Sequence, residues 1–198
     1  MPDEVGPELI SLATELIHSR QTTLPKRLLA PGPSDNQLHA ILGAAASAPD
    51  HGQLLPWRFV LVSDAARLRL ADVFGAALLV RDANATPEQV SQAQEKAFRA
   101  PCLLLVVVDA GKGDPAIDLS ERMISTGCAV QNILLMANAY GFGSGLTSGK
   151  ALKSDLLHQL FSLRPDEHAL CFISLGKVQN QRPIRVRPKV TNYLTVLQ

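Results

Sequence analysis

The chain has 198 residues, of which 46% are hydrophobic and 19% are charged, and its mean hydropathy is +0.10. This length and composition fit one globular domain, residues 1–198, with a sizeable core. Its 19 basic and 18 acidic residues give a formal charge of +1. Such a nearly equal number of positive and negative charges excludes the strongly basic surface typical of a nucleic-acid binder. It also offers no general attraction to an anionic membrane.

The sequence shows no targeting signal and no metal motif. Its longest apolar runs, such as residues 103–108, are far shorter than the roughly 20 residues that cross a bilayer. The acidic start of the chain argues against a secretory leader, so we expect a cytoplasmic protein. There is no CxxC pair and no HExxH motif, so we expect the cysteines to be buried free thiols. They are Cys102, Cys128 and Cys171.

Hydrophobic periodicity predicts a mixture of helices and short strands in the first half of the chain. Ser34 or Asp35 can cap the second helix, and Ala48-Pro49 should end it. The run PCLLLVVVD is continuously apolar, so we expect a strand that is covered on both faces. The expected helices are residues 7–19, 36–47, 65–81 and 87–98, and the expected strands are residues 57–62 and 101–109.

The longest periodic segment, residues 118–140, begins the second half and is nearly free of charge after Arg122. A helix that is apolar nearly all round must be buried, either in the core or against a second subunit. A glycine-rich connection, a short helix and a last core strand are expected at residues 141–149, 150–160 and 169–176. Helices and strands mix without regular βαβ alternation, which favours an α+β fold.

The last segment, residues 177–198, is predicted to be an extended basic tail lying over a surface. Pro183 and Pro188 prevent a continuous helix and favour an extended chain. Arg185 and Arg187 lie two positions apart, so in an extended segment both side chains project to the same side. They could serve an anionic ligand, or they could belong to a merely solvated tail.

The glycine-rich segment nearly matches two phosphate-binding motifs, and both fail. A dinucleotide fingerprint needs a glycine where the chain has Leu146 or Ser148. A Walker loop needs a glycine in place of Ser144 and a Ser or Thr in place of Ala151. The chain also has no GxSxG elbow and no tight pair of carboxylates. If the protein is an enzyme, a cofactor is expected to carry its chemistry.

Three segments together carry a family resemblance. The first is IHSRQ, residues 17–21, after the opening helix. The second is Ala48-Pro49-Asp50-His51 followed by PWRF, residues 56–59. The third is GCAVQN, residues 127–132, leading into GFG and then LTSG, residues 146–149. In this order and spacing the chain resembles the nitroreductase family of FMN enzymes, especially its small bacterial NAD(P)H nitroreductase branch.

The resemblance implies an α+β fold with a mainly antiparallel central sheet flanked by helices, in an intertwined homodimer. It implies FMN as cofactor and NADH or NADPH as co-substrate. The reaction would be ping-pong hydride transfer to a small electron-poor acceptor, such as a nitroaromatic or a quinone. No catalytic side chain is needed, because the flavin carries the chemistry. Alternatives are oxygen-dependent, dehalogenating or dehydrogenase flavin chemistry, or a flavin-binding sensor or carrier without turnover.

The resemblance implies that Ser19, Arg20 and Gln21 bind the cofactor, with Arg20 at the FMN phosphate. A guanidinium suits a phosphate because it binds two oxygens at once, although a solvated helix-end arginine is the alternative. Ser19 stands where the family usually has a second basic residue. Arg185 and Arg187 could supply the missing charge, as could backbone N–H groups or Lys150.

Two further segments are implied to reach the flavin. Pro49, Asp50, His51 and Gln53 would contact a flavin bound largely by the other subunit, although His51 could simply make a local hydrogen bond. Leu55 replaces a glutamine common before Pro-Trp, and Trp57 is expected in the core. The backbone N–H groups of Ser148 and Gly149 would lie near flavin N5 and stabilise negative charge there. The remaining candidates of this second segment are Leu146 and Thr147. As an alternative, this segment only joins a helix to a strand.

Overall fold

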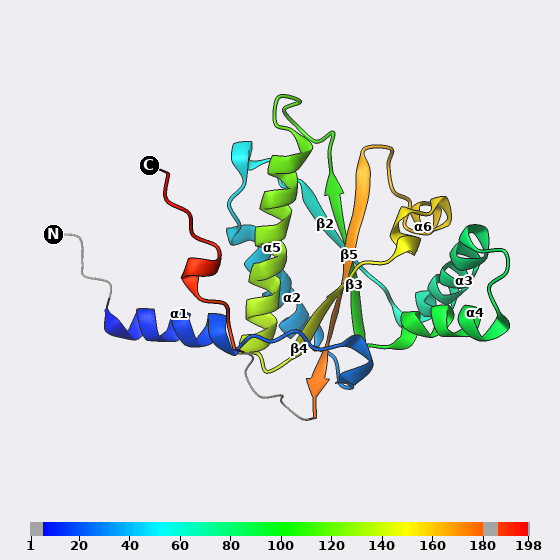
Figure 1. Ribbon diagram of the computed structural model, residues 1–198, viewed down its shortest axis with the longest axis horizontal. Coiled ribbons are helices and arrows are strands. Elements are labelled where there is room, and N and C mark those ends of the chain that lie inside the picture. Colours follow the sequence, from blue (N-terminus) through cyan, green and yellow to red (C-terminus); the bar gives the residue numbers. More distant parts are fainter. Residues whose placement is uncertain (1–5, 180–185, 198) are drawn as a thin grey trace.

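The computed structural model of the chain describes residues 6–179 and 186–197 and is an α+β fold (Figure 1). A five-stranded sheet has the order β1-β5-β3-β2, and its fifth strand, β4, also pairs with β5. All strand pairs are antiparallel, which confirms the predicted fold class. The strands are β1 (Leu28–Leu29), β2 (Trp57–Leu61), β3 (Cys102–Asp109), β4 (Gly143–Thr147) and β5 (Glu167–Val178).

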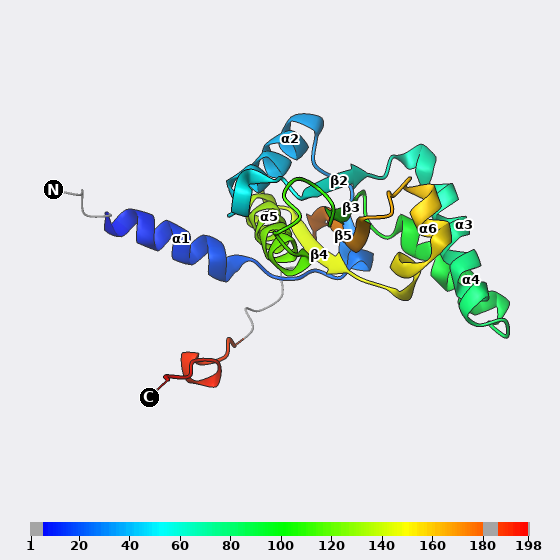
Figure 2. The ribbon, with the colours of Figure 1, turned by 90° about the horizontal axis from the view of Figure 1, so that it is seen from above.

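Helices cover both faces of this sheet. On one side lie α2 and α5, and on the other lie α3, α4 and α6 (Figure 1). The N-terminal helix, α1, projects from the body of the molecule and packs against it only at its C-terminal end (Figure 2). The helices are α1 (Pro7–Ser19), α2 (Asp35–Gly43), α3 (Asp64–Arg81), α4 (Pro87–Gln94), α5 (Leu119–Ala139) and α6 (Asp155–Leu160).

Strand β3 joins the two halves of the core. All eight of its residues are buried, as the continuous apolar run predicted. Leu104 and Val106 pack with α2 and α5, whereas Leu105 and Val107 pack with α3 and α6. This division follows from the alternation of side chains along a strand. Trp57 lies in the first of these clusters and is buried, as expected.

The glycine-rich segment differs from the sequence-based expectation. Part of it forms β4 rather than a plain connection, because residues 143–147 pair with residues 172–176 of β5. Its glycines are required by a neighbouring chain segment. A Cβ on Gly145 would collide with the carbonyl oxygen of Thr23, and one on Gly143 would collide with Val178. Close approach of the chain, rather than a phosphate loop, accounts for these two glycines.

Several helix boundaries also differ from the expected ones. The predicted helix 36–47 is α2 followed by a 3₁₀ turn, and the predicted helix 87–98 is α4 followed by another. The predicted helix 150–160 is interrupted at Ser154, whose side chain caps α6 by accepting from the N–H of Leu157. β5 is longer than expected, because its ends, up to Val178, pair with β1 and β3. Neither of these pairings can be read from local periodicity.

Apolar side chains on α1 and α5 are left uncovered in the single chain. No residue of α1 is buried. Its Leu12 is 64% exposed, and Ile124 on α5 is 68% exposed. Apolar surface of this kind marks a binding surface more often than a solvated one.

The structure also locates the three cysteines, which are all unpaired. Cys102 is buried, and Cys128 and Cys171 are half-buried. Burial raises the pKa of Cys102 and of Cys171 to about 11, so both thiols stay protonated near neutral pH. Within the described residues, no helix is both long and apolar enough to cross a membrane.

Candidate functional site

Two arginines from opposite ends of the chain meet beside the end of α1. The guanidinium of Arg187 donates to the carbonyl oxygen of Arg20 at 3.1 Å. Burial, and then the charge of Arg187, lower the pKa of Arg20. Within residues 6–179 and 186–197, neither arginine has an ion-pair partner. Two adjacent cations with no counter-ion there form a site suited to an anion. Arg185 lies outside the described residues.

The same region adjoins β4. Thr22 forms a parallel bridge with Ser144, and the N–H of Thr23 donates to the carbonyl oxygen of Ser144 at 2.7 Å. Ser19 is anchored in turn, because its hydroxyl accepts from the side-chain amide of Asn138 at 2.9 Å. Gln21 is half-buried between these contacts. The predicted segment 19–21 therefore lies next to the start of β4.

The end of β4 presents the other predicted segment to solvent. Leu146, Thr147, Ser148 and Gly149 are all exposed. No other backbone group of the described chain accepts from the N–H of Ser148 or Gly149. From Ser144 to Ser148 the chain advances about 13 Å at the rise of a strand. A cationic end and a row of free donors thus lie along one edge of the sheet.

The remaining predicted residues lie elsewhere in the protomer. His51 Nδ1 is 2.7 Å from Glu121 Oε2 in the first turn of α5, whereas Ser19 contacts Asn138 in its last turn. These contacts lie about 25 Å apart along a helix that rises 1.5 Å per residue. Pro49, Asp50, His51 and Gln53 are thus separated from the cationic pair within one chain.

Within the segment that carries these four residues, Asp50 has a structural contact of its own. Its carboxylate accepts from the N–H of Leu55 at 2.6 Å and so closes the turn. His51 bonds to Glu121 on another element rather than to a near neighbour in the sequence. The side chain of Gln53 is exposed.

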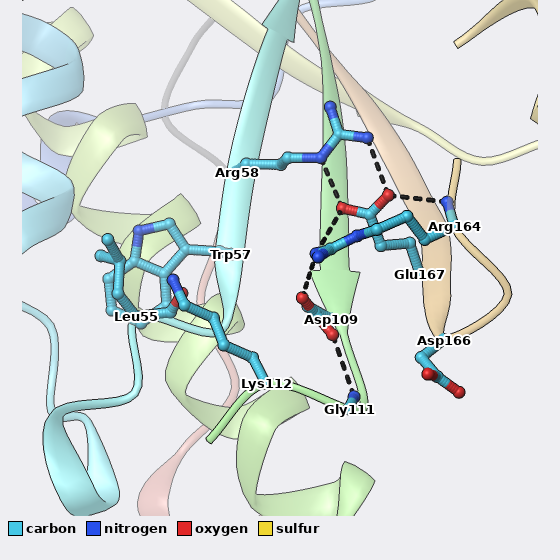
Figure 3. Close-up of a pocket in the computed structure, with 9 residues that line it drawn as sticks. All are labelled: Leu55, Trp57, Arg58, Asp109, Gly111, Lys112, Arg164, Asp166 and Glu167. Carbon is cyan, nitrogen blue, oxygen red and sulfur yellow. Dashed lines mark hydrogen bonds and ion pairs between the residues drawn. The ribbon is translucent and has the colours of Figure 1, made fainter. Parts of the chain in front are cut away.

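A polar pocket of about 350 Å³ lies at the other end of the sheet (Figure 3). None of the predicted flavin residues lines it. Its charges come in equal numbers, and most of them pair with each other. The lining residues are Leu55, Trp57, Arg58, Asp109, Gly111, Lys112, Arg164, Asp166 and Glu167.

An ion-pair network fills one wall of this pocket. Arg58 donates to both oxygens of Glu167 at 2.6 and 3.0 Å, and Arg164 bridges Glu167 to Asp109 (Figure 3). The hydrogen bond from Arg58 is the main reason that the pKa of Glu167 falls to about 2. Since β2, β3 and β5 each contribute a side chain, the network ties three strands together.

Sequence reasoning did not single out these four charged residues as a group. Arg58 stood inside a β-rich run, and Asp109 ended an apolar one, so each was read as part of a strand. Their pairing depends on strand register, which places Asp109 opposite Glu167. In the described part of the chain, no group of three or more acidic, histidine or cysteine side chains could hold a metal ion.

Comparison with known proteins identifies the family. The pattern of the nitroreductase family matches residues 17–177, which is most of the chain. The chain belongs to the nitroreductase family. The resemblance based on three short segments is thereby confirmed.

Curated relatives support this membership over almost their full length. A protein of Haemophilus influenzae named "Putative NAD(P)H nitroreductase" is 34% identical, and the match covers 88% of this chain and 94% of the relative. "Putative NAD(P)H nitroreductase YdjA" of Escherichia coli K12 is 30% identical, with 92% and 98% covered.

Solved structures share the nitroreductase fold. A nitroreductase-like protein from Bacillus cereus superposes with a TM-score of 0.77 at 18% identity, covering 93% of this chain and 95% of the other. A mutant form of the FMN and NADPH-dependent nitroreductase NfnB of a Sphigopyxis strain has a TM-score of 0.74 at 16% identity, with 94% and 99% covered. At such low identity these matches concern the fold alone.

The ion-pair network predicts a pH-dependent stability. The pKa of Glu167 is about 2 in the folded chain against 4.5 ordinarily. The stabilisation is therefore complete above about pH 4.5 and is lost as the pH falls towards 2. Glu167→Gln should lower the free energy of unfolding at pH 7 by about 1–3 kcal/mol. Urea titrations of both proteins at pH 7 and pH 3 measure this difference.

The exposed Glu95, which has no ion pair among the described residues, provides the control variant Glu95→Gln. The control should unfold like the wild type at both pH values. A deficit of Glu167→Gln that is as large at pH 3 as at pH 7 would contradict the role assigned to its charge.

Proposed function

We propose that this nitroreductase is an FMN-dependent oxidoreductase that transfers electrons from NADH or NADPH to a small electron-poor acceptor. The observation that carries the proposal is the Arg20–Arg187 pair, which lacks a carboxylate partner in the described chain and adjoins β4. The relatives' names support NAD(P)H as donor, and that of NfnB supports FMN. Nitroaromatics and quinones are the proposed acceptors.

The residues present fit FMN. The two guanidiniums match a phosphate of charge close to −2, whose negative charge would offset the burial and the repulsion by Arg187 that together lower the pKa of Arg20. The exposed N–H groups of Ser148 and Gly149 match the polar edge of a flat ring. A Cβ on Gly149 would meet no atom within 4 Å, so the backbone is open to close approach.

In this proposal bound FMN supplies the electron transfer, and the protein supplies position and electrostatics. Arg20 and Arg187 hold the phosphate, with Ser19 and Gln21 beside them. The N–H groups of Ser148 and Gly149 donate to the ring and stabilise negative charge as it develops. No side chain needs to act as a nucleophile, acid or base.

We infer that the site is completed by a second copy of the chain. Pro49, Asp50, His51 and Gln53 lie at the opposite end of α5 from Arg20. A two-fold axis across the middle of α5 would bring this segment of one protomer to β4 of its partner. The same arrangement would cover the exposed apolar side chains of α5, including Ile124, and those of α1.

The function is tested directly with purified protein and FMN. We expect the protein to be yellow and to release FMN rather than FAD on denaturation. Anaerobic NADH or NADPH should bleach the bound flavin, and a nitroaromatic or quinone should restore its colour. Bleaching that is slow and not reversed by any acceptor would favour a carrier or sensor. Absence of flavin binding after reconstitution would overturn the proposal.

The phosphate site is tested by comparing FMN with riboflavin, which lacks the phosphate. Arg20→Ala removes a charge-assisted hydrogen bond of roughly 1.5–3 kcal/mol, so FMN affinity should fall about 10- to 150-fold. Arg20→Lys should lose less, because it keeps the charge but not the fork. The double variant Arg185→Ala/Arg187→Ala should likewise weaken FMN binding.

Riboflavin affinity should barely change in any of these arginine variants. The exposed Arg81 on α3 gives the control Arg81→Ala, which should bind both ligands normally. If the tail double variant loses neither ligand, the tail is only solvated. Equal losses of FMN and riboflavin would instead assign the tail arginines to subunit packing.

The proposed dimer is tested with substitutions at two residues whose side chains are almost equally exposed in the single chain. Ile124 on α5 is 68% exposed, and Leu68 on α3 is 69% exposed. Light scattering should show a dimer for the wild type and for Leu68→Glu. Ile124→Glu places a charge in the proposed interface, so it should shift the protein towards monomer and weaken FMN binding. A folded wild-type monomer at micromolar concentration would refute the proposed dimer.

A further inference from the structure

The side chain of Arg122, in the first turn of α5, is only 1% exposed and has no ion pair within the described residues. Its guanidinium donates instead to backbone carbonyl oxygens. The acceptors are those of Ile117 at 2.9 Å, Asp109 at 3.3 Å, Lys112 at 2.5 Å and Asp114 at 2.7 Å. A buried cation is costly unless its donors are satisfied, and here one short segment satisfies them.

Three of the four acceptors belong to the β3–α5 loop, residues 110–118. Apart from Ile117 and the half-buried Ala110, the side chains of residues 110–117 are exposed, so apolar packing cannot determine the shape of this loop. The planar fork of Arg122 does so instead, because four carbonyl oxygens must converge on donors of fixed geometry. The conformation of the β3–α5 loop therefore depends on Arg122.

The β3–α5 loop in turn holds the 49–55 loop. Lys112 Nζ donates to the carbonyl oxygen of Leu55 at 2.8 Å, and the two residues adjoin at the rim of the polar pocket (Figure 3). A Cβ on Gly113 would lie 2.5 Å from Leu54 Cδ2, and one on Gly52 would lie 3.0 Å from Ile117 Cδ1. The two loops thus meet at this hydrogen bond and at the two glycines, where they lie too close together for any larger residue than glycine.

The 49–55 loop needs such support because its backbone is strained. Gln53 and Leu55 have positive φ values of 52° and 49°, in addition to Gly52 at 70°. For residues other than glycine this left-handed conformation costs about 1–2 kcal/mol each. Within the loop, Asp50 offsets part of the cost by accepting from the N–H of Leu55. The carbonyl oxygen of Leu55 is held from outside, by Lys112.

We propose that Arg122 and Lys112 are positioning residues of the flavin site, acting through the 49–55 loop. Arg122 shapes the β3–α5 loop, and Lys112 fixes the carbonyl oxygen of Leu55. The strained loop then presents Asp50, His51 and Gln53 to the flavin of the partner. This inference rests on the proposed function, since that function gives the 49–55 loop its ligand.

Lys112→Met is the decisive variant, because it keeps an apolar stem and removes only the donor to Leu55. Lys112 is exposed, so the variant should fold and unfold like the wild type. Its affinity for FMN and for riboflavin should fall equally, by about 5- to 10-fold, as one hydrogen bond from a partly solvated charge implies. The visible circular dichroism of the bound flavin should also change. Lys112→Arg, which restores a cationic donor, should recover both properties.

Lys96→Met, at another exposed lysine, is the matched control and should leave affinity and spectrum unchanged. Arg122→Lys keeps the charge but not the fork, so it should reproduce the spectral change of Lys112→Met, together with lower stability. If the wild type binds FMN and Lys112→Met has wild-type affinity and spectrum, the positioning role is refuted and the proposed function stands. If the wild type itself binds no flavin, the proposed function fails first.

Discussion

The burial of β3 on both of its faces is the constraint on which the arrangement of this molecule depends. Alternate side chains of the strand enter two separate clusters, and β2 and β5 occupy both of its edges. The middle of the sheet therefore has no free backbone donor or acceptor to offer a ligand. Free polar backbone groups remain on the outer strands of the sheet, β4 among them, and in the loops beyond the strand ends. Both parts of the proposed flavin site lie in such places.

The local sequence predicted those elements whose hydrophobic pattern identifies them without reference to any neighbouring element. Strand β3 and helix α5 were expected almost to the residue, because a run of seven apolar residues and a long periodic segment without charge after Arg122 leave little choice. Strand β4 was not expected, since Gly143 and Gly145 have low strand propensity and pair only because β5 and Thr23 lie beside them. The Glu167 network was missed for the same reason, because it exists only through strand register.

For the candidate site, the sequence supplied the residue types and the fold supplied their grouping. Residues 19–21 and 146–149 were expected to act together, and the bridge from Thr22 to Ser144 lies between them. The distance between Arg20 and the 49–55 loop could not be read from sequence, because it is set by the length of α5. Helix α5 separates the two halves of the proposed site within one chain. A second copy of the chain would explain both the exposed face of this helix and the incompleteness of the site in a single chain.

The choice of partner for Arg122 bears on how such a divided site can stay ordered. A carboxylate would have satisfied the charge at one point and left the β3–α5 loop free to adopt other shapes. Carbonyl oxygens satisfy it only when several backbone groups converge, so the cost of burying the cation is offset in one loop conformation and not in its alternatives. Lys112, in that same loop, then transfers the constraint to Leu55, whose left-handed backbone would otherwise relax. A loop of this kind is already ordered before it meets the partner. Little further conformational entropy is lost on binding, so the free-energy cost of binding the flavin across a subunit boundary is lower.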